Sequence, residues 1–325
     1  MKKSIILILA VIMLLTAFYF FTNEKKTLKE YQDDSGNIIY TSIYPLYELV
    51  KEIGGVDTDI AIEFVVPSGS EIHNYEPSPR SLALLENADI FLYIGTGLEP
   101  WAERIDVSLA ASGVKTVELS KYLDLIRYDE ERVEVHFHGK GERHHEEGHL
   151  HGIYDPHVWL DPLNMKKMAE IVKDELILLD PDKKEMYIDN YLNYLSRLEE
   201  LERDFNILEK KKRDIIVVSH AAFGYLAERY GFRQLSLLGT TPHGEPTPGS
   251  LAEIIRMIRE NEIEYIFVET LTDDRIVNVL IEETGVEALP LNPFLGLTAE
   301  ELENGEDYFS IMRKNLTNLK KALVE

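Results

Sequence analysis

A long stretch without glycine or proline divides this sequence into two similar halves. Residues 182–212 are rich in Leu, Glu, Lys, Tyr and Asn. Their apolar positions recur at helical spacing, at Leu192, Leu195, Leu198 and Leu201. The pattern predicts one continuous helix of about eight turns, on the order of 45 Å long. A helix of this length must extend along the whole molecule, so each half of the chain has to fold against part of it.

Short β-rich runs alternate with helical patterns on both sides of this helix. Before it, strands are predicted at residues 38–44, 59–66, 90–94 and 114–119, with helices at 46–53 and 81–86. After it, strands are predicted at 215–219, 234–238, 265–269 and 286–290, with helices near 224–230, 251–261, 276–283 and 308–324. Such alternation predicts parallel βαβ units. We therefore expect an α/β protein with lobes at residues 38–181 and 213–325, joined by the helix 182–212, and a site in the cleft between them.

The N-terminus has the pattern of a targeting segment. Lys2 and Lys3 precede an apolar run at residues 5–21, which is typical of a secretory signal or a membrane anchor. Aromatic residues at 18–21 favour an uncleaved signal-anchor over a small-residue cleavage site, and a buried core helix is the third alternative. Residues 1–23 are thus predicted to export the chain. Everything after a polar linker at 24–37 is expected outside the cytoplasm, at the cell surface or in the periplasm, membrane-anchored or secreted.

Cysteine is absent, and acidic residues outnumber basic ones, 58 to 34. The missing thiols exclude disulfides, thiolate metal sites, iron–sulfur clusters, a thiol nucleophile and a lipid-bearing cysteine anchor. A formal net charge of −24 argues against binding to nucleic acid, because phosphate backbones are repelled. Any metal site must therefore be built from imidazole nitrogens and from carboxylate or amide oxygens.

Residues 136–151, HFHGKGERHHEEGHLH, form a histidine-rich segment without apolar periodicity. Short tracts of this kind are typical of metal binding by a loop, and a merely solvated polar loop is the alternative. Residues 145–149 also match the HExxH pattern of zinc proteases. That pattern needs a stable helix to hold its two histidines one turn apart, and Gly148 lies inside the match. The protease interpretation is therefore set aside.

The other four histidines are His73, His157, His220 and His243. His73 and His220 follow predicted strands, and His157 precedes a helix. In parallel sheets, ligands bind beyond the carboxyl ends of the strands. Each histidine alone is more simply explained as a structural or exposed residue. Three of them at loop positions in two halves of the chain indicate a metal bound between the lobes.

Four motifs carry a family resemblance: HNYEPSP, DPHVWLDP, SHAAFGYLAERYG and GEPTPGSL. In order and spacing they resemble the cluster of ABC-transporter solute-binding proteins that capture zinc or manganese, from about residue 38 to the C-terminus. The resemblance implies two Rossmann-like lobes held by a long backbone helix, with the metal site in the interlobe cleft. It also implies His73, His157 and His220 as metal ligands, and gives no such role to His243.

The resemblance leaves the fourth ligand open. Family members that use three histidines and an aspartate place the aspartate near residues 291–296, where this sequence has Asn292. A water molecule, Asn292 or a carboxylate such as Glu71 are the alternatives. Three neutral imidazoles favour Zn²⁺ over Mn²⁺, which prefers more oxygen ligands. The histidine-rich segment, common in zinc-binding members, points the same way.

The function expected from the resemblance is capture without catalysis. The protein would bind Zn²⁺ outside the cytoplasm and deliver it to the membrane permease of an ABC transporter, acting as a monomer with no nucleic-acid partner. A manganese-binding member of the same family is the first alternative. A surface adhesin or metal store and a zinc hydrolase are the others; the hydrolase would need a general base such as Glu71 or Glu76.

Overall fold

The computed structural model describes residues 36–56, 58–68, 70, 72–127, 153–238, 247–269 and 275–325. The predictions for the export segment 1–23, for nearly all of the linker 24–37 and for the histidine-rich segment 136–151 lie outside these residues. Within the described part of the chain, no helix is both long enough and apolar enough to cross a membrane.

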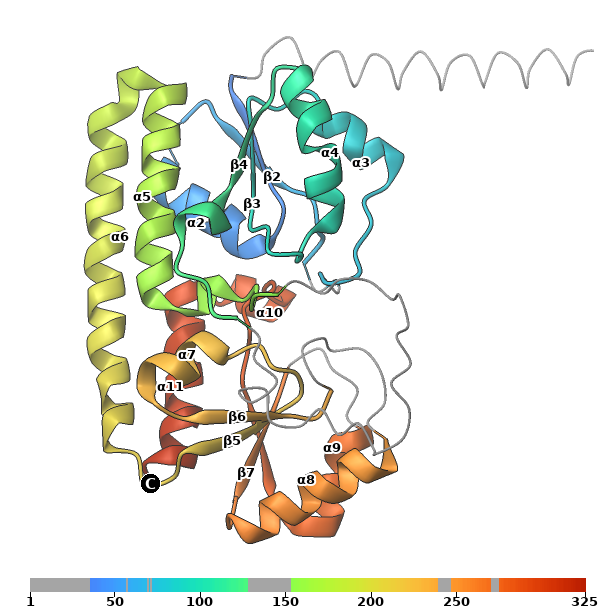
Figure 1. Ribbon diagram of the computed structural model, residues 1–325. Coiled ribbons are helices and arrows are strands. Elements are labelled where there is room, and N and C mark those ends of the chain that lie inside the picture. Colours follow the sequence, from blue (N-terminus) through green and yellow to red (C-terminus); the bar gives the residue numbers. More distant parts are fainter. Residues whose placement is uncertain are drawn as a thin grey trace, which may run out of the picture.

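The N-terminal lobe is built on a four-stranded parallel sheet. Its strands are β1 (Ile38–Thr41), β2 (Ala61–Phe64), β3 (Ile90–Tyr93) and β4 (Lys115–Glu118), in the order β2-β1-β3-β4. Helices α2 (Tyr44–Gly54), α3 (Pro79–Leu85) and α4 (Pro100–Ala111) form the crossovers. All four residues of β3 are buried, as expected for a central strand covered on both faces (Figure 1).

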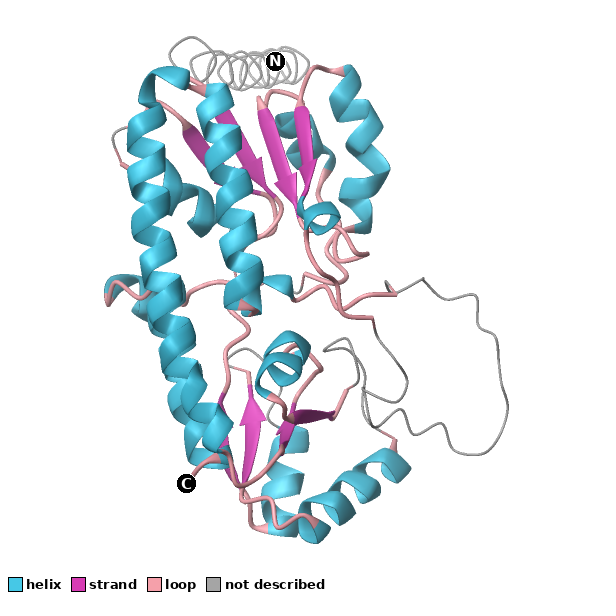
Figure 2. Cartoon of the chain, turned by 60° about the vertical axis from the view of Figure 1, so that its left-hand side comes forward, coloured by secondary structure: helices cyan, strands magenta, loops and turns pink. Residues whose placement is uncertain are grey.

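The C-terminal lobe repeats this arrangement with a different sequence. Strands β5 (Ile215–Val218), β6 (Arg233–Ser236), β7 (Tyr265–Val268) and β8 (Glu287–Pro290) are all parallel, in the order β6-β5-β7-β8. Its helices are α7 (Gly224–Tyr230), α8 (Pro248–Glu260), α9 (Arg275–Thr284), α10 (Ala299–Glu303) and α11 (Tyr308–Leu323). Figure 2 shows the two sheets one above the other. The predicted α/β class with two parallel sheets is confirmed.

Most strands end one to three residues before their predicted carboxyl ends, and the first two bear on the site. The prediction for residues 38–44 is wrong beyond Thr41, because α2 begins at Tyr44 with a proline in its first turn. β2 ends at Phe64, yet the backbone N–H groups of Val65 and Val66 still donate to the carbonyls of Thr41 and Ser42, at 2.9 and 3.0 Å. The chain therefore stays beside this sheet as far as Val66 and then turns, before it reaches His73.

The long connecting segment is less regular than predicted. α6 covers Lys184–Phe205, and short 3₁₀ turns flank it at Pro181–Lys183 and Asn206–Lys210. The prediction of one α-helix over residues 182–212 is therefore wrong at both ends, where tighter turns are common. A second helix, α5 (Pro162–Leu179), lies beside α6 (Figure 1). α6 contacts α2 of the first lobe and α11 of the second.

Arg197 of α6 connects the two lobes electrostatically. Its guanidinium donates to Glu52 of α2 at 2.8 Å and also to Asp307, the N-cap residue of α11. The same guanidinium lies over the ring of Phe309, 3.9 Å from its centroid. Beside it, the carboxylate of Glu48 accepts the backbone N–H of Tyr308 at 2.7 Å. Side chains of α2, α6 and α11 thus hold both lobes at one point.

A buried carboxylate fills the carboxyl-end edge of the first sheet. Glu99 is fully buried and accepts the hydroxyl of Ser42 at 2.5 Å and the backbone N–H groups of Ile94 and Gly95, at 3.2 and 3.1 Å. These donors follow β1 and β3, which flank the point where the strand order reverses, the usual ligand position in such sheets. In the first lobe the protein's own side chain occupies this position.

Candidate metal centre

The structure brings His73, His157 and His220 together from three separate segments. His73 lies in the turn that follows β2, His157 immediately precedes a 3₁₀ turn at Val158–Leu160, and His220 follows β5. One ring nitrogen from each lies within 4.8 Å of the other two. The ring centroids are 5.2 Å apart for His73–His157 and for His157–His220, and 5.9 Å apart for His73–His220. The three histidines named from the sequence form one cluster between the two sheets.

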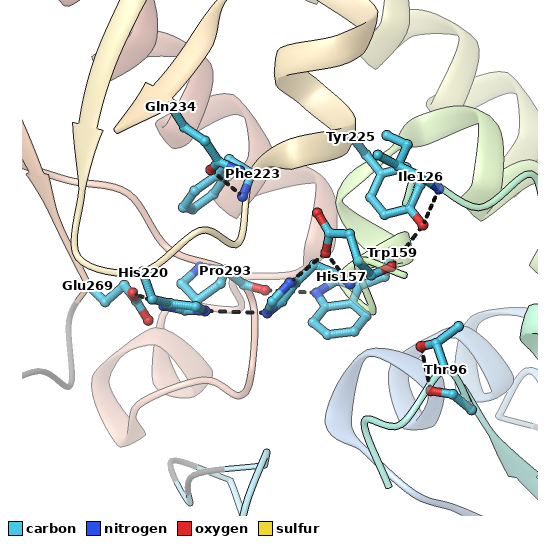
Figure 3. Close-up of polar contacts among 12 residues, drawn as sticks. Thr96, Ile126, His157, Trp159, His220, Phe223, Tyr225, Gln234, Glu269 and Pro293 are labelled. Atoms are coloured by element: carbon cyan, nitrogen blue, oxygen red, sulfur yellow. Dashed lines mark hydrogen bonds and ion pairs between the residues drawn. The ribbon is translucent and has the colours of Figure 1, made fainter. Parts of the chain in front are cut away.

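The distance between His157 and His220 matches a metal site. Their Nε2 atoms lie 3.3 Å apart, and Figure 3 shows the two rings directed at one another. In a tetrahedral zinc site with Zn–N bonds of about 2.0–2.1 Å, two ligand nitrogens lie about 3.3–3.4 Å from each other. These two imidazoles therefore already have the separation of a ligand pair. His73 offers the third nitrogen, within 4.8 Å of the other two.

Each of these two imidazoles is held by a carboxylate. Asp155 Oδ1 lies 2.8 Å from His157 Nδ1 and also accepts the backbone N–H of His157 at 3.0 Å. Glu269 Oε1 faces the Nδ1 atom of His220 (Figure 3). A carboxylate only accepts, so both Nδ1 atoms carry the proton, and both Nε2 atoms present a lone pair to the cluster. The carboxylates thus select the tautomer that can bind a metal.

Burial keeps His157 neutral. His157 and His220 are 0 % exposed, and the Nε2 atom of His73 is shielded from solvent. Burial, followed by the charge that His220 can carry, holds the pKa of His157 well below its ordinary value. A neutral imidazole is the form that binds a metal, so His157 is available as a ligand at neutral pH.

The ring of His157 rests on a rigid buried support. The indole of Trp159 packs against it edge to face, with centroids 5.5 Å apart. Trp159 is itself fixed, because its Nε1–H donates to the carbonyl of Pro293 at 2.8 Å and its own carbonyl accepts the hydroxyl of Tyr308 at 2.9 Å. Segments from both halves of the chain therefore fix the position of this ligand.

Asn292 has a structural role in the turn beneath the site. Its Oδ1 accepts the backbone N–H of Phe294 at 2.7 Å, and its own backbone N–H and carbonyl bond to the side chain of Asn315, at 2.8 and 2.7 Å. Phe294 adopts φ 60°, a conformation that this turn supports. The two other residues considered at the sequence level, Glu71 and His243, lie outside the described residues.

Two supporting carboxylates, Asp155 and Glu269, were missed at the sequence level. Asp155 stands two residues before His157 in the DPHVW motif, and this spacing could have identified it as a hydrogen-bond partner of that histidine. Glu269 is the last residue of the predicted strand 265–269, where an acid at the carboxyl end of a strand was a weaker signal. Only the sheet order places it beside His220, because β5 and β7 are neighbours.

Fold and site together define a class: two-lobed α/β proteins with an imidazole cluster between the lobes. The sequence matches the family described as the periplasmic component A of the zinc-uptake complex over residues 39–322. The chain belongs to this family.

Individual relatives agree with this assignment. The zinc-binding lipoprotein AdcA of Streptococcus pneumoniae is 36 % identical over 292 residues, which cover 90 % of this chain and 56 % of that protein. The chain thus spans little more than half of that relative's length. The high-affinity zinc uptake system protein ZnuA of Bacillus subtilis is 32 % identical over 287 residues, covering 88 % of this chain and 87 % of that protein. The crystal structure of the Zn(II)-bound ZnuA-like domain of S. pneumoniae AdcA superposes with a TM-score of 0.74 and 32 % identity, covering 90 % of this chain and all of that one.

Proposed function

We propose that this protein captures Zn²⁺ outside the cytoplasm and delivers it to the permease of an ABC transporter. The observation that carries the proposal is the cluster itself, with the Nε2 atoms of His157 and His220 at the spacing of zinc ligands and His73 beside them. His73, His157 and His220 are the proposed ligands. A water molecule is the simplest fourth ligand, because it can leave when the ion is handed on.

Zinc fits this donor set better than manganese. Three neutral imidazoles suit Zn²⁺, whereas Mn²⁺ prefers sites with more oxygen donors. The carboxylates of Asp155 and Glu269 face Nδ1 atoms, so in this arrangement they accept hydrogen bonds from the imidazoles and do not add oxygen donors to the cluster. The names of the relatives, a zinc-binding lipoprotein and a zinc uptake protein, support the same ion.

Transport fits the site better than hydrolysis. A zinc hydrolase needs a general base beside the metal-bound water. Glu76, one candidate for that role, is exposed and forms an ion pair with Arg104, whose Nη2 lies 2.6 and 2.9 Å from the two carboxylate oxygens. We therefore assign the protein no enzymatic activity. We also expect it to act as a monomer, and its formal net charge of −24 favours no nucleic-acid partner.

Attachment to the membrane is proposed to differ from that of the pneumococcal relative. That protein is named a lipoprotein, whereas this chain has no cysteine to carry a lipid. The apolar run within residues 1–23 is the alternative anchor, with the charged start of the chain left in the cytoplasm.

The histidine-rich segment 136–151 is proposed to gather zinc at lower affinity and to pass it to the site. Its six histidines are the basis of this proposal. Deleting residues 136–151 should slow uptake at limiting zinc and leave uptake at ample zinc unchanged. Equal uptake with and without the segment at limiting zinc would contradict this role.

Metal analysis tests the main proposal. Protein comprising residues 24–325 should retain one tightly bound zinc per chain, and the variant His73→Ala/His157→Ala/His220→Ala should retain none. His243→Ala, the same change at a histidine outside the proposed site, is the matched control and should keep its zinc. A triple variant that still holds one tightly bound zinc places the site elsewhere. Preferential retention of manganese at equal supply overturns the metal assignment.

A further inference from the structure

We propose that the contact between Asp155 and Gly224 positions His157 relative to His220. Asp155 is the positioning residue, and Gly224 is glycine because a side chain there would collide with the Asp155 carboxylate. The inference rests on the proposed zinc capture, and it concerns how two ligands from different segments are held at the spacing of a zinc site.

Asp155 is fixed on all sides. It is 1 % exposed, and its backbone N–H donates to the carbonyl of Ile126 at 2.8 Å. Its own carbonyl accepts the hydroxyl of Tyr225 at 2.8 Å, and that hydroxyl also accepts the backbone N–H of Ile126 at 3.3 Å (Figure 3). Because the backbone is held in this way, the carboxylate has little freedom except rotation about its own side-chain bonds.

The two carboxylate oxygens face different segments. Oδ1 holds the backbone N–H and the Nδ1 atom of His157, whereas Oδ2 lies against Gly224, the first residue of α7. A Cβ atom at position 224 would lie 2.3 Å from this Oδ2. Real Cβ contacts do not become so short, so a side chain at 224 has to displace the carboxylate.

Glycine is required here for space. The backbone of Gly224 has no positive φ that would call for glycine. The same Cβ would lie 3.4 Å from Gln234 Nε2, an ordinary contact, and Gln234 is itself held because its Oε1 accepts the backbone N–H of Phe223 at 3.0 Å. The clash therefore falls on Asp155, whose carboxylate has to shift while it accepts buried hydrogen bonds from His157.

The contact connects the two ligands because the short segment between β5 and α7 carries His220 and leads directly into Gly224. This segment turns tightly at its start, since the backbone N–H of Ala222 donates to the carbonyl of His220 at 2.9 Å. The carboxylate therefore touches His157 with one oxygen and the segment that carries His220 with the other. A displaced Asp155 frees the ring of His157 and removes the acceptor that keeps its proton on Nδ1.

A double-mutant cycle on the full chain tests this contact between Asp155 and Gly224. Gly224→Ala, Asp155→Ala and their combination are compared with Gly249→Ala. This last change is the matched control, because Gly249 also lies in the first turn of a helix and a Cβ there would have no atom closer than 3.8 Å. Zinc affinity is measured by competition with a chelating dye, and folding is checked by thermal unfolding.

Each of Gly224→Ala and Asp155→Ala should lower zinc affinity by about 10–100-fold, the usual effect of losing a support of a metal ligand. The double variant should be no weaker than Asp155→Ala alone, since both changes act through one carboxylate. Gly249→Ala should stay within about 2-fold of the wild type. The proposal is overturned if the double variant loses zinc affinity by the product of the two single-variant losses. It is also overturned if Gly224→Ala binds zinc as tightly as the wild type.

A second readout does not depend on the stability of Gly224→Ala or on metal. Imidazole ¹⁵N spectra of the zinc-free protein should show the Nδ1–H tautomer at His157 in the wild type and the Nε2–H tautomer in Asp155→Ala. Asp155→Asn, whose amide oxygen still accepts, should restore most of the Nδ1–H form and most of the affinity. If His157 keeps the Nδ1–H tautomer in Asp155→Ala, Asp155 does not position this ring. A wild type that binds no zinc refutes the proposed function and leaves the tautomer test standing.

Discussion

The Nε2 atoms of His157 and His220 lie 3.3 Å apart, while both Nδ1 atoms face carboxylates. When both imidazoles are neutral, both Nε2 atoms therefore carry lone pairs that point toward one another. Such a pair repels unless a proton or a cation lies between the two nitrogens. Packing and hydrogen bonding hold this arrangement, so the folding energy of the protein maintains a site that is complete only with a cation.

Protons should compete with zinc at this site. Metal binding needs neutral imidazoles, so affinity falls as pH decreases. Because the pKa of His157 is held well below its ordinary value, this ligand resists protonation in mild acid, and the main loss should occur below about pH 6. Dissociation constants measured between pH 5 and pH 8 should be nearly constant at the upper end and rise toward the lower end. Tighter binding at pH 5 than at pH 7 would contradict the imidazole site.

Asn292→Ala should reduce stability and leave zinc binding nearly unchanged. Its side-chain oxygen accepts a buried backbone N–H, and losing that acceptor costs about 1–3 kcal/mol. Thermal unfolding should show this loss, with zinc affinity within about 3-fold of the wild type. Asn318→Ala removes an exposed bond to a backbone carbonyl and should cost less than about 1 kcal/mol. A large loss of zinc affinity in Asn292→Ala would make this residue a ligand after all.

Glu99 should make folding stability depend on pH. Burial raises the pKa of this carboxyl to about 7, above the value of 4.5 that is usual for glutamate. The folded protein therefore binds a proton more tightly than the unfolded chain, and stability falls as pH rises from about 4.5 to about 7. At about 1.4 kcal/mol per pKa unit, the effect is on the order of 3 kcal/mol.

Unfolding of Glu99→Gln at several pH values checks this expectation. The variant should lose about half of the decline in stability between pH 5 and pH 7.5, because glutamine does not ionise, whereas Glu48, whose pKa burial also raises to about 7, still contributes. Glu170→Gln, a change at an exposed position on α5, should keep the wild-type profile. If Glu99→Gln followed the wild-type curve over the whole range, another group would be responsible.

Arg197→Met should weaken the connection between the lobes. The variant loses ion pairs with Glu52 and Asp307, whose charged groups are only partly buried, and the contact over the buried ring of Phe309. We expect a loss of about 1–2 kcal/mol in the free energy of unfolding. Arg256→Met, whose ion pairs with Glu253 and Glu260 both lie within α8, should cost no more than about 1 kcal/mol. Equal melting temperatures for Arg197→Met and the wild type would remove Arg197 as a lobe connection.

Local sequence patterns predicted the α/β class and the positions of most strands. Runs such as residues 90–94 and 215–219 are short, apolar and bounded by turn formers, so their pattern depends little on the rest of the chain. The ends of elements were less predictable. β1 stops at Thr41 because of the helix that begins at Tyr44, and α6 gives way to a 3₁₀ turn at Asn206.

The sequence by itself, through its family motifs, named the three histidines that cluster in the described part of the chain. His73, His157 and His220 stand in motifs at strand ends and helix starts, and the absence of cysteine left imidazole as the main nitrogen or sulfur donor. Only the tertiary structure decided how these rings are held. Asp155, Gly224 and Glu269 act through contacts between segments distant in the chain, and no local pattern records a separation in space. The 3.3 Å between His157 and His220 depends on the packing of both lobes against the segment that joins them.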